Sequence, residues 1–165
     1  MVTKETYEAL RAIARDGPRQ QQLEPMRGAL REVAGLKSEG TFSGHRIVID
    51  EPVEFGGSGS AANPAEVLLA ALGASLQVTT RVYAALMDIP VTRIRIELGG
   101  TLDTRGFFDT DASVRSGFDA VNVNLQVESP AAQDKVRELV AKVERACPVL
   151  DIIRAPTPVK LELVS

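Results

Sequence analysis

Few side chains in this sequence could carry covalent chemistry. The 165 residues include one cysteine, Cys147, and one histidine, His45. One cysteine cannot form a disulfide within its own chain, and a structural zinc site needs a cluster of Cys and His ligands. Asp109 and Asp111 lack further ligands and are interpreted as a solvated turn. The sequence therefore predicts no metal site and no cofactor.

Cys147 has two interpretations. It follows Val136, Leu139, Val140 and Val143 at helical spacing, so we expect it on the buried stripe at the C-terminal end of a helix. A buried free cysteine usually behaves as a small apolar residue. A reactive thiol is the alternative, although a helix C-terminus does not favour the thiolate.

Ser75 is the second candidate nucleophile. Its surroundings, GASLQ, lack the G-x-S-x-G elbow of hydrolases, and a relay would need His45, which we expect on a strand. The competing interpretation is a small residue packed in a central helix.

The Gly56–Ser60 loop, GGSGS, has the composition of a phosphate-binding loop but lacks its G-K-[ST] continuation. We interpret it as a loop that leads into a helix, with Asn63 as the cap and Pro64 as the first helical residue. Phe107 and Phe108, together with Phe118, occupy a long loop, 103–118. They could line an apolar substrate-binding surface or anchor the loop in the core, and both interpretations stay open.

The hydrophobic spacing predicts an order α-β-β-α-β-β-α-β, which is an α+β fold. A polar linker, 19–25, follows the first helix, and the turn-rich KSEGTFSG separates the first two strands, which form a hairpin. We expect a helix and linker over 1–25 and a single domain over 26–165. The predicted helices are Lys4–Arg15, Ala65–Met87 and Pro130–Ala146 with Ser129 as its cap; the predicted strands are Met26–Ala34, Gly44–Asp50, Arg93–Leu98, Ala120–Glu128 and Pro158–Val164.

Composition excludes several function classes. The net charge of −3 and the pI of about 5.3 argue against a nucleic-acid partner, which needs a basic face. No secretory signal is visible in MVTKETYEAL, and the apolar run Val67–Leu76 is too short for a membrane span. We expect a cytoplasmic protein without a membrane partner.

The helix 65–87 is apolar almost all round, so other residues must cover it on every side, either from sheets or from a second subunit.

Several short motifs, in order, resemble the OsmC/Ohr family of osmotically inducible proteins and organic hydroperoxide reductases. They are DEP at 50–52, GGSGSAANPAEVLLAALGAS at 56–75, GTLDTRGF at 100–107, GF at 117–118 and ACPV at 146–149. The resemblance extends from about Met26 to Val164. It implies antiparallel sheets wrapped around a central apolar helix in an intertwined homodimer.

The resemblance also implies a thiol-dependent reaction. In the family, a cysteine in the central helix attacks the peroxide O–O bond, the cysteine of the CPV motif resolves the sulfenic acid to a disulfide, and an external thiol reduces it. Cys147 matches the resolving cysteine, whereas Ser75 occupies the position of the attacking one. A serine hydroxyl has no comparable oxidation ladder, so Ser75 cannot perform the family's peroxide step.

The other family site residues match less closely. The family's site arginine comes from the first hairpin, where Arg31 is the best match, with Arg27 and Lys37 as other candidates. The family's site carboxylate follows the NP, where this chain has Ala65, and Glu66 comes one residue later. At about 100° per residue, Glu66 and Ser75 lie on opposite faces of a helix.

Three functions remain open. The first is a protein of hydroperoxide reductase lineage, acting on or binding small apolar hydroperoxides, with its attacking position disabled by a natural or an engineered serine. The second is a non-catalytic dimeric module that binds a small apolar ligand where the active site would be. The third is a hydrolase that uses Ser75.

Overall fold

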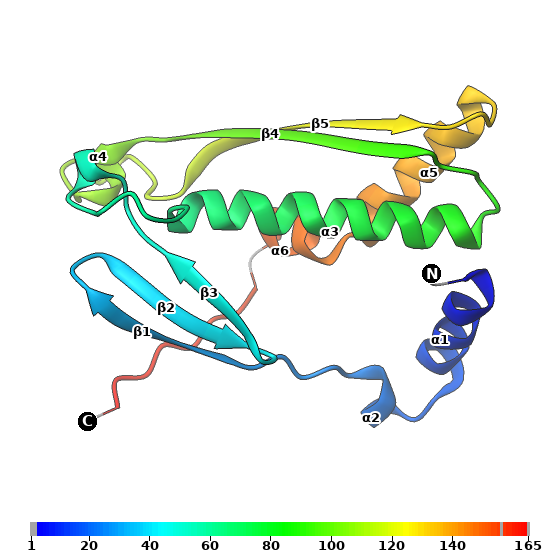
Figure 1. Ribbon diagram of the computed structural model, residues 1–165, viewed down its shortest axis with the longest axis horizontal. Helices are drawn as coiled ribbons and strands as arrows, with labels where there is room; N and C mark the ends of the chain where they lie inside the picture. Colours follow the sequence, from blue (N-terminus) through cyan, green and yellow to red (C-terminus); the bar gives the residue numbers. More distant parts are fainter. Residues whose placement is uncertain (1–2, 156, 165) are drawn as a thin grey trace. The chain divides into compact units, whose positions relative to one another are not determined.

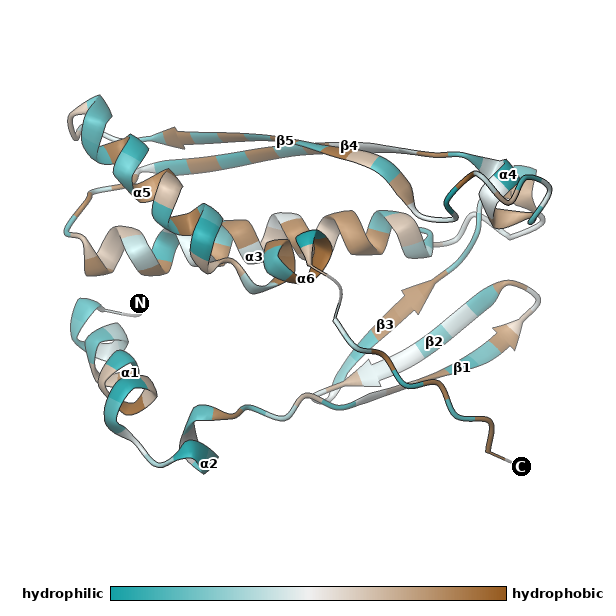
Figure 2. Cartoon of the chain, turned by 180° about the vertical axis from the view of Figure 1, so that it is seen from behind, coloured by the Kyte–Doolittle hydropathy of each residue, from teal (hydrophilic) through white to brown (hydrophobic). Residues whose placement is uncertain are grey.

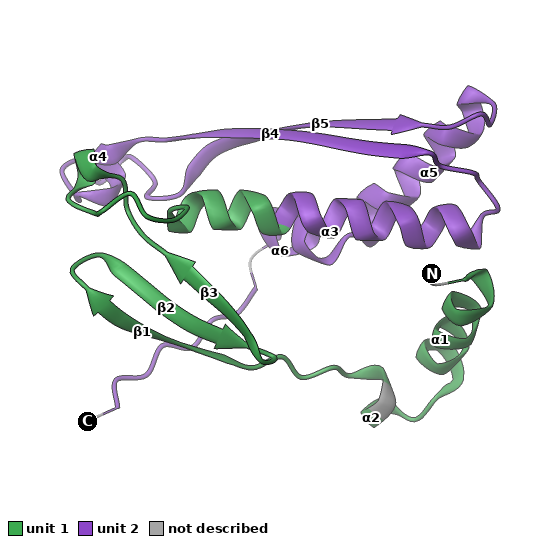
Figure 3. Cartoon of the chain, viewed as in Figure 1, with its two compact units in different colours: residues 1–71 green, residues 72–165 purple. Residues whose placement is uncertain are grey.

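The computed structural model describes residues 3–155 and 157–164 (Figure 1). Its contacts divide the chain into two compact units, residues 1–71 and 72–165, with the boundary inside the long helix α3 (Figure 3). The sequence-based division at residue 25 stays a prediction.

The first unit begins with the predicted N-terminal helix. α1 spans Lys4–Asp16, and the amide of Gly17 caps it by donating to the carbonyl of Ile13. Leu10 and Ile13, on its apolar stripe, are exposed, and α1 buries none of its residues. The polar segment that follows includes one helical turn, α2, Arg19–Gln22.

A three-stranded antiparallel sheet forms the middle of this unit, in the order β1 (Gly28–Ala34), β2 (Lys37–Phe42) and β3 (His45–Ile49). The prediction of a two-stranded hairpin with a turn over KSEGTFSG was wrong, because KSEGTF is itself a strand. The chain reverses at positive φ at Gly35 and at Ser43-Gly44, so each turn needs only two residues. Lys37, Ser38 and Glu39 of β2 are half-buried and Thr41 is exposed. Glu39 lies opposite Arg31 on β1.

The long helix α3, Pro64–Leu86, confirms the helix predicted over Ala65–Met87. Asn63 and Glu66 begin it through reciprocal bonds: the Glu66 amide donates to Asn63 Oδ1, and the Asn63 amide donates to Glu66 Oε2. Figure 2 shows how far apolar residues extend along α3. Within residues 3–155 and 157–164, it is the one helix long and apolar enough to cross a membrane, a test that core helices of soluble proteins also pass.

The second unit packs α3 against a two-stranded antiparallel sheet and two further helices. β4 (Arg93–Leu102) pairs with β5 (Phe118–Glu128), which confirms two predicted strands, and both alternate between half-buried apolar and exposed residues. Ile96 lies opposite Leu125, and Leu98 lies opposite Val123. The short helix α4, Thr104–Phe107, lies in the predicted long loop.

The core of this unit joins α3 to α5, Gln133–Ala146, and α6, Pro148–Arg154. α5 begins three residues later than predicted, with Ala132 at its N-cap, while the Ser129 hydroxyl accepts a bond from the Ala131 amide. α6 was not predicted, because Pro148 was interpreted only as a stop and also suits a first helical position. The buried residues of the main core cluster are Leu72, Leu76, Ala84, Ile89, Leu139, Val143 and Cys147.

The strand predicted over Pro158–Val164 is wrong for this chain taken alone. Residues 157–164 carry no strand pairing, and the apolar members of their alternating pattern are open to solvent. Val159 is 88% exposed and Leu163 is 100% exposed. A period-two pattern needs a neighbouring strand edge, and no described strand of this chain pairs with these residues.

The core of the second unit gives a direct stability test. Leu139 is fully buried, so Leu139→Ala should lower the free energy of unfolding by about 2–5 kcal/mol. Urea denaturation followed by circular dichroism measures the change. Leu10→Ala, on the exposed face of α1, is the matched control and should change it by less than about 0.5 kcal/mol. Equal effects for the two variants would contradict this core assignment.

Candidate functional site

Ser75 and Cys147 come from two elements of the second unit. Ser75 lies in the middle of α3, between the buried residues Leu72 and Thr79. Cys147 lies at the junction of α5 and α6, and only 1% of it is exposed. Its predicted place at the buried C-terminal end of a helix is therefore correct.

The structure brings these two side chains into contact. Ser75 Oγ and Cys147 Sγ are 3.2 Å apart and form a hydrogen bond in which either atom can donate. Ser75 is half-buried, while the thiol is enclosed by the core. One turn further along α3, the Thr79 hydroxyl donates to the Ser75 carbonyl at 2.7 Å. The two residues chosen from the sequence thus form one polar pair at the edge of an apolar core.

A glycine allows α3 to approach the sheet near this pair. Gly73, two residues before Ser75, is buried, and a Cβ at this position would lie 2.9 Å from Cδ1 of Leu98 on β4. The absence of a side chain at residue 73 therefore brings the helix closer to β4 than most residues allow.

Arg31 and Glu66 have partners of their own in the first unit. Arg31 lies on β1, opposite Glu39, with 3.9 Å between Arg31 Nη2 and Glu39 Oε2. Arg46 on β3 also contacts this carboxylate, with 2.6 Å between Arg46 Nε and Glu39 Oε1. The hydrogen bond from Arg46 is the main cause of the lowered pKa of Glu39. Glu66 is exposed and caps α3. The site roles inferred for Arg31 and Glu66 stay predictions.

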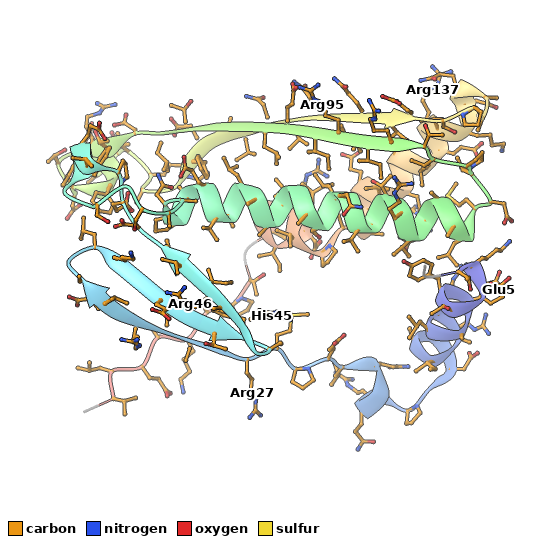
Figure 4. The ribbon with its side chains drawn as sticks, viewed as in Figure 1. Glu5, Arg27, His45, Arg46, Arg95 and Arg137 are labelled. Atoms are coloured by element: carbon orange, nitrogen blue, oxygen red, sulfur yellow. The ribbon has the colours of Figure 1, made fainter. Side chains whose placement is uncertain are left out.

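His45 lies on β3, as expected, and is exposed (Figure 4). The contact found for the Ser75 hydroxyl is the Cys147 thiol, and His45 belongs to the other unit. A hydrolase relay through His45 has no support in these contacts.

Phe107 and Phe108 are not anchored in the core of this chain. They are 71% and 61% exposed, and their rings meet edge to face with centroids 5.0 Å apart. Arg105 stabilises their loop by pairing with Asp103 and Asp111. The interpretation of these rings as a lining for an apolar ligand stays a prediction.

Asp111 of this loop has hydrogen-bond partners within the loop. Asp111 accepts bonds from the Ser113 amide and hydroxyl as well as from Arg105. In the part of the chain that the structure describes, no three His, Cys, Asp or Glu side chains are grouped to hold a metal.

The Gly56–Ser60 loop has no backbone amide available to bind an anion. The amides of Gly56, Gly57 and Gly59 donate to the carbonyls of residues 53, 52 and 51. The amides of Ser58 and Ser60 donate to the carboxylate of Asp50. Because all five amides donate to residues 50–53, none remains for a phosphate. Sequence reasoning missed Asp50 as a structural residue; the two serines of the loop were the available signal.

Comparison with known proteins identifies the family. The family model described as OsmC-like protein matches residues 57–162, which is more than half of the chain. The chain belongs to the OsmC-like family. None of the curated protein sequences searched matches it.

Solved OsmC structures support the same fold. An OsmC-like protein from Mycoplasma pneumoniae is 16% identical, with a TM-score of 0.70 over 81% of this chain and 89% of that one. An organic hydroperoxide resistance protein OsmC from Legionella pneumophila is 22% identical, with a TM-score of 0.59 over 80% and 90%. A Vibrio cholerae protein, described as a putative organic hydroperoxide resistance protein with captopril bound in one active site, is 19% identical, with a TM-score of 0.58 over 81% and 87%. The predicted family and α+β fold are therefore confirmed.

The 3.2 Å contact predicts that a disulfide can form when both positions are cysteine. Ser75→Cys should oxidise to a disulfide with Cys147 under mild oxidant, because an S–S bond of about 2.05 Å needs only a small adjustment from this separation. Mass spectrometry of the intact, non-reduced protein should show the loss of two hydrogens.

The matched control is Gln77→Cys, two residues further along α3 and exposed. It should keep two free thiols under the same oxidant. A Ser75→Cys variant that also keeps both thiols would contradict the pairing.

Proposed function

We propose that this chain is an OsmC-family protein of the hydroperoxide reductase lineage, that Ser75 and Cys147 occupy its reacting positions, and that Ser75 disables the two-cysteine cycle. The contact between Ser75 Oγ and Cys147 Sγ carries the proposal. Several structural relatives are described as organic hydroperoxide resistance proteins, which supports a small apolar hydroperoxide as the substrate class.

The chemistry shows why the atom at position 75 matters. A thiolate attacks a hydroperoxide ROOH, the O–O bond breaks, and a sulfenic acid and the alcohol ROH form. A second thiol then displaces water from the sulfenic acid and forms a disulfide, which an external dithiol reduces with two electrons. The Ser75 hydroxyl cannot be oxidised in this way. The cycle therefore stops before its first step, and Cys147 has no second thiol in its own chain.

A second candidate function is a non-catalytic module that binds a small apolar ligand. The favouring observation is the state of Cys147, whose thiol is buried and bonded to a hydroxyl rather than to another thiol. In this alternative, Cys147 is a core residue, and ligand binding needs no redox partner.

The proposal includes a homodimer and a cytoplasmic location, where thiol reductants are present. Four exposed apolar residues, spaced three or four apart, follow one face of α3: Leu68, Ala71, Ala74 and Val78. This spacing places them on a single stripe that the chain's own residues leave exposed. The exposed apolar side chains of residues 157–164 also agree with burial against a second copy.

Ser75→Cys should convert the protein into an active hydroperoxide reductase. With tert-butyl hydroperoxide and a dithiol, peroxide loss should rise at least about 100-fold above the unmodified chain, because a thiol replaces a weak nucleophile. Gln77→Cys adds the same thiol to an exposed position of α3 off this stripe and should leave the rate unchanged.

A Ser75→Cys variant that forms the disulfide but consumes no peroxide would reject the hydroperoxide function. The ligand-binding alternative would then be preferred.

The dimer predicts a mass in solution of twice the 17.7 kDa of the chain. Val78→Asp places a charge on the exposed stripe of α3 and should raise the dimer dissociation constant at least about tenfold. Gln77→Asp changes a neighbouring exposed residue off this stripe and is the matched control. Light scattering coupled to size-exclusion chromatography measures the masses of the unmodified protein and of the two variants. A monomeric unmodified chain would contradict the dimer.

A further inference from the structure

Asp50 is a buried carboxylate that the proposed function does not use. It follows β3 directly, and only 1% of it is exposed. Among the described residues, no Lys or Arg forms an ion pair with it. A buried charge without an ion partner is costly unless hydrogen bonds compensate it.

Five hydrogen bonds supply this compensation. Asp50 Oδ1 accepts from the amides of Glu51, at 2.9 Å, and Ser58, at 3.4 Å. Oδ2 accepts from the Ser60 amide, at 3.0 Å, and from the hydroxyls of Ser58 and Ser60. All five donors belong to the segment of residues 51–62, which we name the strap.

The ends of the strap meet at the same residue. The Asp50 amide donates to the carbonyl of Ala62 at 3.2 Å. Inside the strap, Gly57 lies so close to Glu51 that a Cβ would overlap the Glu51 carbonyl oxygen. Asn63, the cap of α3, comes directly after the strap. Asp50 therefore contacts the beginning, the middle and the end of the loop that leads into α3.

We propose that Asp50 is the lock of the strap: its carboxylate holds residues 51–62 closed as one unit, and removal of its charge opens the whole strap and frays the first turn of α3. The donors surround both carboxylate oxygens, so an amide in place of the carboxylate would turn its NH₂ group toward N–H and O–H donors. The other carboxylates of the strap, those of Glu51 and Glu54, form no hydrogen bond with these donors and do not replace Asp50.

The lock should persist in mild acid. The Ser58 hydroxyl, followed by the other strap donors, holds the pKa of the Asp50 carboxyl well below its usual range, although burial acts in the opposite direction. A carboxyl with a lowered folded-state pKa contributes its full stabilisation above the unfolded pKa of about 3.9 and loses it as the pH falls further. The strap should therefore stay closed at pH 4.5.

Hydrogen exchange tests the lock. Asp50→Asn should accelerate exchange of the amides of residues 58–60 at least about tenfold at pH 7, while the amides of β5 and α5 keep their rates. Asp111→Asn, a carboxylate that also accepts from a serine amide and hydroxyl, is the matched control and should leave the strap unchanged. The proposal would be overturned if the strap amides of Asp50→Asn exchanged at their unmodified rates, or if amide exchange accelerated equally throughout the chain.

Two further measurements apply even if Asp50→Asn does not fold. The double variant Ser58→Ala/Ser60→Ala keeps the carboxylate and its amide donors. The exchange rates of its strap amides should therefore lie between those of the unmodified protein and those of an open loop. In the unmodified protein, protection of residues 58–60, corrected for intrinsic rates, should be equal at pH 7 and pH 4.5. The proposal would be overturned if the strap amides of the double variant exchanged as slowly as those of the unmodified protein. It would also be overturned if residues 58–60 of the unmodified protein lost their protection at pH 4.5.

Discussion

The arrangement of the second unit depends on the apolar contact between α3 and the C-terminal helices. Leu72 and Leu76 are buried on α3, and Leu139 and Val143 are buried on α5, in one cluster that also contains Cys147. Burial of such side chains contributes about 1.5–3 kcal/mol each. The polar contact between Ser75 and Cys147 forms at the edge of this cluster. The geometry of the candidate site is therefore a result of apolar packing rather than of the polar pair itself.

Much of this unit could be predicted from the sequence because its periodicities are strong. The alternation in Arg93–Leu98 and Ala120–Glu128 gave two strands, and the apolar run after Asn63 gave α3. The spacing of Val136, Leu139 and Val143 placed Cys147 on a buried stripe. The link between Cys147 and Ser75 came from the family motifs, since spacing along the chain does not show which residues of two helices meet.

Other features depend on partners that a linear pattern does not display. The strand Lys37–Phe42 has polar residues and a glycine, and it forms because two neighbouring strands pair with it. Residues 158–164 show the opposite case, in which a strand pattern lacks a pairing edge within the described chain. Asp50 was assigned only to a motif, because its five donors lie up to ten residues further along.

The proline after Cys147 has a consequence for how this protein can vary. A residue before proline is disfavoured from helical angles, and Cys147 has φ −75° and ψ 114° between α5 and α6. The bend between α5 and α6 is thus favoured by two adjacent residues, Cys147 and Pro148. Substitutions elsewhere in the two helices leave this backbone preference intact, whereas the burial of the sulfur still depends on the apolar cluster around it.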